Sequence, residues 1–325
     1  MWAGLSWADR RSGVLALLIL SVVSNATSRV YSLIMHLILP LLASLLFVCG
    51  LIVIKRAGAA GVNSATTLFC TNIAAAIAFS FVWFLGGEEI RWDLWWQPLI
   101  IAKLFVFGLV FTFLAIERGD VSLATPIFGV KVVFVALLLT LSGEEQLPLQ
   151  VWIAAAMATL GIGLIQWTGK GHRHHVIFTV CLALAAAACY ATFDVLVQRW
   201  APVWGAGRFL PVVYWIVGVA ALFLLPWVDF QPCKKRSVAG LLIAGSILIA
   251  LQAICIVVAV GLFGDAARVN VVYALRGLWG VALAWLVAWK WGGAEAEHSR
   301  STMILRVTGA SILTTAVILV IIAGA

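Results

Sequence analysis

Charge is what this sequence has least of. Only 10% of its 325 residues are Asp, Glu, Lys or Arg, whereas a soluble domain carries about 25%. Hydrophobic residues make up 64%, and a soluble fold cannot bury that much apolar surface. The alternation of apolar and polar residues that a transmembrane β-barrel requires is also missing. These absences leave an all-α integral membrane protein that crosses the bilayer several times.

Catalytic and metal-binding motifs are lacking as well. The chain contains no GxSxG, HExxH or P-loop motif, and its six cysteines form no CxxC pair. The GHRHH loop holds His172, His174 and His175 but offers no fourth ligand, so it reads as a solvated linker. We therefore expect no enzyme activity, no cofactor and no metal.

The net charge of +8 does not indicate a nucleic-acid partner. Its cations are scattered over short connections and helix ends, where Lys and Arg usually flank membrane spans. The expected partners are the lipid bilayer of the inner or plasma membrane and a small-molecule substrate. Counted over the connections, Lys and Arg oppose a cytoplasmic N-terminus unless residues 13–23 form an eleventh span. The sequence leaves the orientation and the oligomeric state open.

The apolar residues form runs of roughly 20, which is the length a helix needs to cross the hydrocarbon core. We predict ten transmembrane helices, at residues 36–54, 65–86, 97–115, 121–141, 149–167, 176–197, 209–228, 237–263, 267–289 and 302–323. Their connections are too short to hold a soluble domain. Residues 1–34 form an N-terminal extension. Its apolar run reads as a signal-like segment, an extra helix or an extension ahead of a start at Met35, and we favour the last.

The chain repeats itself internally. A constant offset of 145 residues pairs Gly119 with Gly264, Asp120 with Asp265 and, further on, a lysine with an arginine inside the fourth and ninth spans. We therefore divide the chain into a first five-helix repeat, 35–170, and a second, 171–325. Because five is odd, the two copies have opposite orientations in the membrane. Inverted repeats of this kind are typical of secondary transporters, which bind substrate near the midplane where the halves meet.

The paired cations are Lys131 and Arg276, and they are the main candidates for a binding site. A cation at the centre of a membrane helix costs about 2.5–3.5 kcal/mol on insertion scales, so it normally faces a partner or a polar cavity. A two-fold axis would bring the two together, where they repel each other unless an anion lies between them. Asp194 is the only carboxylate inside a predicted helix and is the candidate counter-charge. One carboxylate does not neutralise two cations, so we expect the substrate to supply a negative group.

Other polar and special residues surround these cations in the sequence. The offset pairs Thr125 with Asn270, and Tyr273 lies three residues before Arg276, so all three are candidate substrate contacts. Pro126 and Gly129 precede Lys131 and would shape the cavity by kinking the helix. The alternative for every one of these residues is structural. The cations would then bond to Asp194 or to backbone carbonyls, and the polar groups would bond between helices.

The end of the first half has a recognisable pattern. It joins a proline-bearing fourth helix, a Gly-Glu turn and a glycine-rich fifth helix, carried by Pro126, Gly143, Glu144, Gly161 and Gly163. With these features the chain, over about residues 35–325, resembles the EamA-type family of the drug/metabolite transporter superfamily. The second half departs from the pattern, with Val271 in place of proline and a longer loop before its last helix. The resemblance implies ten helices and metabolite transport. In anion-exchanging branches, basic cavity residues hold phosphate groups, a role that suits Lys131 and Arg276.

These observations predict a secondary transporter that moves a small anionic or zwitterionic metabolite by alternating access. Two other classes remain open. One is a flippase for a phosphorylated lipid carrier, in which the same cations take the headgroup phosphate and the site opens sideways to lipid. The other is a structural membrane protein whose cations are sealed in hydrogen bonds.

Overall fold

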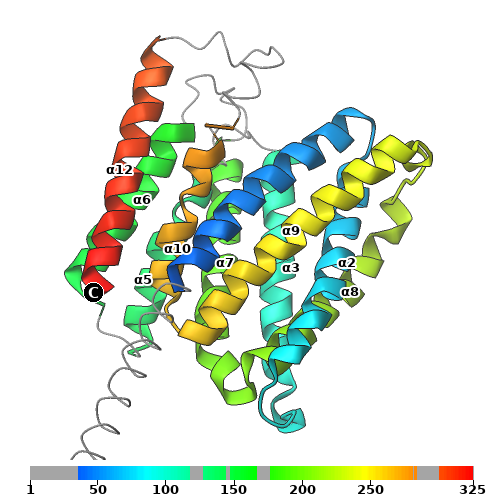
Figure 1. Ribbon diagram of the computed structural model, residues 1–325, viewed down its shortest axis with the longest axis horizontal. Helices are drawn as coiled ribbons and strands as arrows, with labels where there is room; N and C mark the ends of the chain where they lie inside the picture. Colours follow the sequence, from blue (N-terminus) through cyan, green and yellow to red (C-terminus); the bar gives the residue numbers. More distant parts are fainter. Residues whose placement is uncertain are drawn as a thin grey trace, which may run out of the picture.

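The computed structural model describes residues 36–117, 127–143, 147–166, 176–280, 282–283 and 300–324, and within these ranges every regular element is a helix. The helices lie side by side in one bundle (Figure 1). Seven of the described helices are long and apolar enough to cross a membrane: His36–Ala59, Ser64–Leu85, Trp96–Ile116, Val176–Trp204, Ala206–Trp227, Arg236–Phe263 and Ile304–Ile322. The protein is therefore an integral, multi-pass membrane protein, as its composition predicts.

In the labels of Figure 1 the described helices are as follows: α2 (Ser64–Val82), α3 (Trp96–Glu117), α5 (Lys131–Leu141), α6 (Leu149–Gln166), α7 (Val176–Trp204), α8 (Ala206–Ala221), α9 (Arg236–Phe263), α10 (Ala266–Tyr273) and α12 (Arg300–Gly324). Short 3₁₀ turns extend α2 and α8, at Trp83–Leu85 and Leu222–Trp227, and others occur at Trp92–Leu94 and at η4 (Pro232–Lys234). The helix His36–Ala59 precedes α2. α7 continues seven residues past its predicted end, with Pro202 in its final turn.

Two helices that the sequence predicts as continuous are interrupted. Before α5, Gly129 and Val130 form a turn, and after α10, Ala274 and Leu275 form another. Each turn has i→i+3 backbone bonds in place of the α-helical pattern, from Val132 N to Gly129 O in the first half and from Gly277 N to Ala274 O in the second. Both helices then resume, the first at Lys131 and the second at Arg276.

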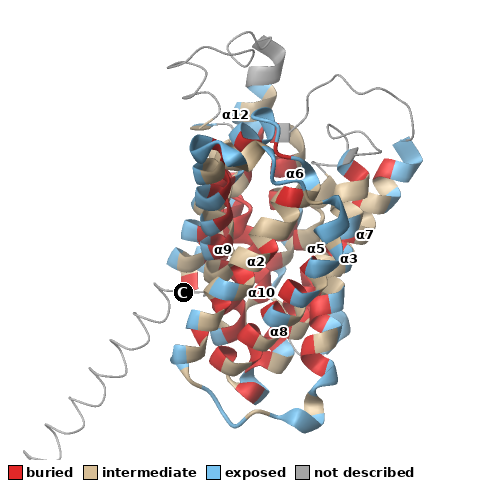
Figure 2. Cartoon of the chain, turned by 90° about the vertical axis from the view of Figure 1, so that its right-hand side faces the viewer, coloured by how far each residue is buried: buried red, intermediate tan, exposed pale blue. Residues whose placement is uncertain are grey.

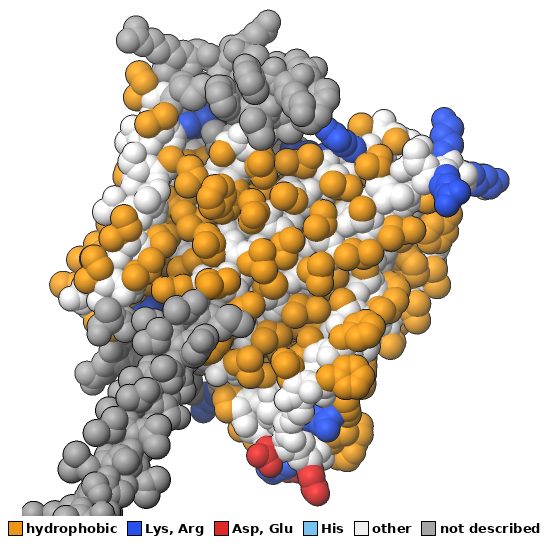
Figure 3. Space-filling model, in the orientation of Figure 1, with side chains coloured by type: hydrophobic (Ala, Val, Ile, Leu, Met, Phe, Trp, Pro, Cys, Tyr) orange, Lys and Arg blue, Asp and Glu red, His pale blue; other side chains and the backbone are white. Residues whose placement is uncertain are grey.

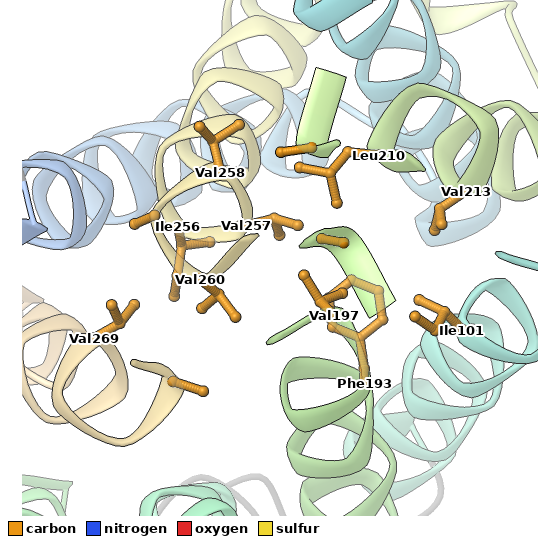
Figure 4. Packing of buried hydrophobic residues seen from close by; sticks show 14 of the residues in the cluster. Ile101, Phe193, Val197, Leu210, Val213, Ile256, Val257, Val258, Val260 and Val269 are labelled. Carbon is orange, nitrogen blue, oxygen red and sulfur yellow. The ribbon is translucent and has the colours of Figure 1, made fainter. Parts of the chain in front are cut away.

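The helices pack in pairs drawn from the two halves of the chain. α2 packs on α8, α5 on α10 and α6 on α12, while α3 packs on α7. The helix His36–Ala59 runs beside α9, where Gly50 and Gly245 allow the two backbones to approach. Buried residues lie on the stretches of helix that face the inside of the bundle, and exposed residues lie on its outer faces and ends (Figure 2). The largest core cluster joins α3, α7, α8, α9 and α10 through residues such as Ile101, Phe193 and Val260 (Figure 4).

The pair α6 and α12 meets at two glycines. A Cβ atom added to Gly161 would lie 2.9 Å from the carbonyl oxygen of Gly309, and one added to Gly309 would lie 2.7 Å from the carbonyl oxygen of Gly161. Inside a membrane the hydrophobic effect does not drive helices together, because lipid tails are as apolar as the helix side chains. Close approach of two backbones at small residues is therefore a main source of helix association. By contrast, a Cβ atom at Gly163 would meet nothing within 4 Å.

This contrast gives a matched pair of variants. Gly161→Ala should lower the stability of the protein by about 1–3 kcal/mol, because the crossing must open to accept the methyl group. Gly163→Ala, two residues away on the same helix, should unfold at the temperature of the parent protein or slightly above it. Thermal unfolding in detergent measures both. Equal unfolding temperatures for the two variants would contradict the tight crossing.

Candidate functional site

Lys131 and Asp194 form an ion pair inside the bundle. Lys131 is the first residue of α5, Asp194 lies in the middle of α7, and the two helices pack on each other. The Lys131 Nζ lies 2.7 Å from the Asp194 Oδ2, with the two side chains 15% and 5% exposed. A charge-assisted bond of this length compensates much of the cost of placing both groups in a low-dielectric interior.

Asn270 of α10 binds the same carboxylate. Its Nδ2 donates to the Asp194 Oδ2 at 2.6 Å and to the carbonyl oxygen of Ala266, one turn earlier, at 2.8 Å. Because a carboxylate only accepts, the amide nitrogen must be the group that faces it. One oxygen atom of Asp194 thus joins α5, α7 and α10, and the side chain of Asn270 is 2% exposed.

The second buried cation has different surroundings. Arg276 follows the Ala274–Leu275 turn, and its guanidinium lies 4.5 Å from the ring centre of Tyr273 and 5.2 Å from that of Phe47. These two rings meet edge to face at 6.2 Å. Cation–π contact stabilises a guanidinium without neutralising it. Among the described residues no carboxylate forms an ion pair with Arg276.

Arg276 and Lys131 belong to one electrostatic cluster, because they lie close enough for their charges to repel. Both also stand at the start of a helical segment that follows a turn. The two halves therefore concentrate positive potential in the same region of the bundle, where α5 packs on α10.

The structure brings some of the predicted site residues into contact with one another, and others lie apart or outside the described residues. Asp194 pairs with Lys131, and Asn270, predicted as a substrate contact, bonds to Asp194. Tyr273 contacts Arg276 through its ring. Gly129 is a buried turn residue whose carbonyl accepts a hydrogen bond of 3.2 Å from the Thr159 hydroxyl. Thr125 and Pro126 lie outside the described residues.

Sequence reasoning missed three neighbours of the cluster. Phe47 is an ordinary aromatic residue in an apolar run, and nothing in the sequence distinguishes it. Gln198 follows Asp194 by one helical turn, and its Oε1 accepts from the backbone N–H of Ala266 at 2.8 Å, at the start of α10. Its spacing was a usable signal. Tyr214 of α8 is buried, stacks on Phe79 at 3.6 Å and lies close enough to Asp194 for the two to interact electrostatically.

The protein is a multi-pass helical bundle with a charge cluster in its interior. Among the described residues, Lys131 in this cluster pairs with a carboxylate and Arg276 does not. The protein is therefore an integral membrane protein with a polar centre. Residues 34–167 match the model of the EamA-like transporter family. Residues 34–167 are therefore similar to this family of membrane transporters, and the resemblance seen in the sequence is confirmed over this part of the chain.

Solved structures extend the likeness of the fold to both halves. One chain, described as "Crystal structure of protein", is 17% identical with a TM-score of 0.61, over 86% of the present chain and 96% of its own. In all, 28 chains of solved structures match. No curated protein matches the sequence.

Proposed function

We propose that this protein is a secondary transporter for a small anionic or zwitterionic metabolite. The substrate binds at the midplane between two inverted five-helix repeats and crosses by alternating access. The observation that carries the proposal is the pair Lys131 and Arg276, two cations at equivalent positions of which Lys131 alone pairs with a carboxylate among the described residues.

The pairing of helices supports the inverted repeat. If the five helices of each half correspond in order, α2 matches α8, α5 matches α10 and α6 matches α12, and each of these pairs is in contact. A two-fold axis in the membrane plane brings matched helices together in this way. It also exchanges the pair α3 and α7 with the pair formed by α9 and the helix His36–Ala59, which lie side by side. The seven long spans together with α5, α6 and α10 then make up ten.

The charges indicate how a substrate would be held. Asp194 neutralises Lys131, whereas Arg276 keeps its positive charge against two aromatic rings. A substrate with one carboxylate or phosphate group would bind Arg276 directly, in a bidentate arrangement that a guanidinium favours. Lys131 lies within electrostatic reach and would strengthen that binding. Asn270 and Tyr273 border the same region and would contact the rest of the molecule.

The interrupted helices support the location of the site. Secondary transporters commonly bind substrate where helices are broken near the midplane, because the ends of half-helices present free backbone groups there. Here both breaks immediately precede the two cations, and α5, which begins at Lys131, packs on α10, which ends three residues before Arg276. A break is also a natural hinge, because a turn changes its φ and ψ angles more easily than a continuous helix.

A purely structural role is the second candidate, and one observation favours it. Lys131, Asp194 and Asn270 already satisfy one another through short bonds between three helices. A cluster of this kind can fix the packing of α5, α7 and α10 without any ligand. The two candidates differ in Arg276, which the cluster does not need for packing and the transporter needs for binding.

A ligand screen tests the proposal. Purified protein should unfold at a higher temperature in the presence of a metabolite that carries one carboxylate or phosphate group. It should be indifferent to the neutral amide or ester of the same compound. A ligand at 100 times its Kd adds about 2.7 kcal/mol of stability, which a thermal scan detects easily. The stabilising compound should then exchange across proteoliposomes that contain the protein. Stabilisation without exchange, or no response to any anion, would contradict the transporter.

A further inference from the structure

Two segments far apart in the sequence meet at the end of the bundle where α9 begins. Ala57 and Val62, at the end of the first helix, pack with Val238 and Leu242 of α9 in a small buried cluster. Gly61, with a φ of 100°, turns the chain against the ring of Pro232, to which an added Cβ atom would lie 3.7 Å. The connection 59–63 and the connection 228–236 therefore form one corner of the molecule.

This corner carries five exposed cations, Lys55, Arg56, Lys234, Lys235 and Arg236. Figure 3 shows Lys and Arg side chains gathered at this end, beyond the apolar face of the bundle. Asp229 is the one carboxylate in these two connections, and its Oδ1 already accepts a hydrogen bond from the backbone of Gln231 at 2.8 Å. The corner thus has a large excess of positive charge.

Hydrogen bonds hold the backbone of the corner in place. Asn63 caps α2 by accepting from Thr66 N at 2.7 Å, and its Nδ2 donates to the carbonyl of Trp227 at 3.1 Å. The Thr66 hydroxyl donates to the carbonyl of Asp229 at 3.1 Å and accepts from its backbone N–H at 2.9 Å. The backbone of the corner that carries the cations is therefore held in a fixed conformation.

This corner of the molecule lies at a membrane boundary. It joins the end of one span to the start of another, and Trp227 and Phe230 beside it are 66% and 49% exposed, as aromatic residues at headgroup level are. The opposite end of the bundle is different. Glu88, Glu89 and Asp93 are exposed there, and Arg91 pairs with Asp93 at 2.8 Å. The hydrogen bond from Arg91 lowers the pKa of Asp93, so that this carboxylate stays ionised.

We propose that the basic corner, formed by Lys55, Arg56, Lys234, Lys235 and Arg236, binds the headgroups of anionic phospholipids on the cytoplasmic side of the membrane. Clustered cations next to a span attract anionic headgroups, and an excess of Lys and Arg in short connections directs them to the cytoplasm. The helix His36–Ala59 begins, and α12 ends, at the opposite end of the bundle (Figure 1). In this orientation the start of that helix and the end of α12 face away from the cytoplasm.

Lipid retention tests the binding. Purified protein is incubated with equal amounts of phosphatidylglycerol and phosphatidylcholine in detergent, and the retained lipids are counted by native mass spectrometry. The parent protein should retain phosphatidylglycerol preferentially at low salt and lose the preference in high salt. Replacing all five cations by glutamine should reduce the preference by about tenfold or more. The control, Arg91→Gln, removes a cation at the other end and should change nothing. A preference unaffected by the five replacements overturns the proposal, as does the lack of any preference in the parent protein.

Cysteine labelling tests the side of the membrane. In a cysteine-free background, Ala60→Cys places a thiol on the basic corner and Glu89→Cys places one at the other end, both at exposed positions. An impermeant maleimide added to intact cells should label Glu89→Cys and leave Ala60→Cys unlabelled until the membrane is opened. The reverse pattern overturns the cytoplasmic assignment.

Discussion

Uptake of the transported anion into proteoliposomes should fall by about ten- to a hundredfold when Arg276 is replaced by glutamine. A hydrogen bond to a charged group contributes about 1.5–3 kcal/mol, and this variant removes the member of the Lys131–Arg276 pair that no described carboxylate compensates. The protein should still fold, because the contacts of Arg276 with Phe47 and Tyr273 are cation–π contacts that glutamine gives up without leaving a charge unpaired. Arg276→Lys keeps the charge but loses the planar, bidentate group, and should recover only part of the uptake.

The matched control for this variant is Lys103→Gln. Lys103 also lies in a predicted span, but its side chain is exposed on the outside of the bundle. Its replacement should leave uptake within about twofold of the parent protein, since it removes a cation that reaches the headgroup region. If Arg276→Gln transports as well as Lys103→Gln does, the substrate role of Arg276 is wrong.

The buried ion pair should dominate stability. Replacing Lys131 by methionine leaves Asp194 charged and without its cation, and removing one member of a buried pair costs about 3–5 kcal/mol. Asp194→Leu should be similarly costly, because Lys131 then keeps its charge without its carboxylate. The double variant Lys131→Met/Asp194→Leu should recover most of the lost stability, because well-packed apolar side chains often replace a buried pair at little cost.

A double-mutant cycle in detergent measures this coupling. The free energies of unfolding of the two single variants and of the double variant should be strongly non-additive. Asp194→Leu leaves one N–H of Asn270 without its acceptor in the single and in the double variant alike, so this cost cancels from the coupling energy. Additive effects, or single variants as stable as the parent, would mean that the ion pair is not formed in the folded protein.

The charged residues of the site could be predicted from the sequence, because a charged residue inside a long apolar run is easily recognised in the sequence alone. Lys131 and Arg276 were found in this way, and the offset between the halves related them. The scarcity of acids led equally directly to Asp194. The resemblance of the first half to the EamA-type family rests on a proline, a Gly-Glu turn and two glycines, and Gly161 lies at a tight crossing in the structure.

The sequence could not predict which of the site residues contact one another. Whether Asp194 binds Lys131 or Arg276 depends on how far each helix is rotated about its axis, and no linear pattern records that rotation. The same holds for Phe47, which is one apolar residue among many until it lies beneath a guanidinium. The break at Ala274 and Leu275 has no glycine or proline to announce it. In the structure it lies at the position that the offset of 145 residues pairs with the turn at Gly129 and Val130.

Binding affinity measured on matched ligands tests the central claim most directly. Isothermal titration should give a Kd for the transported anion on the parent protein and much weaker binding of its neutral amide. On Arg276→Gln the anion and the amide should bind with nearly equal, weak affinity, because the positive charge that discriminates between them is gone. If Arg276→Gln still prefers the anion as strongly as the parent protein does, the negative group is bound elsewhere and the proposed site is refuted.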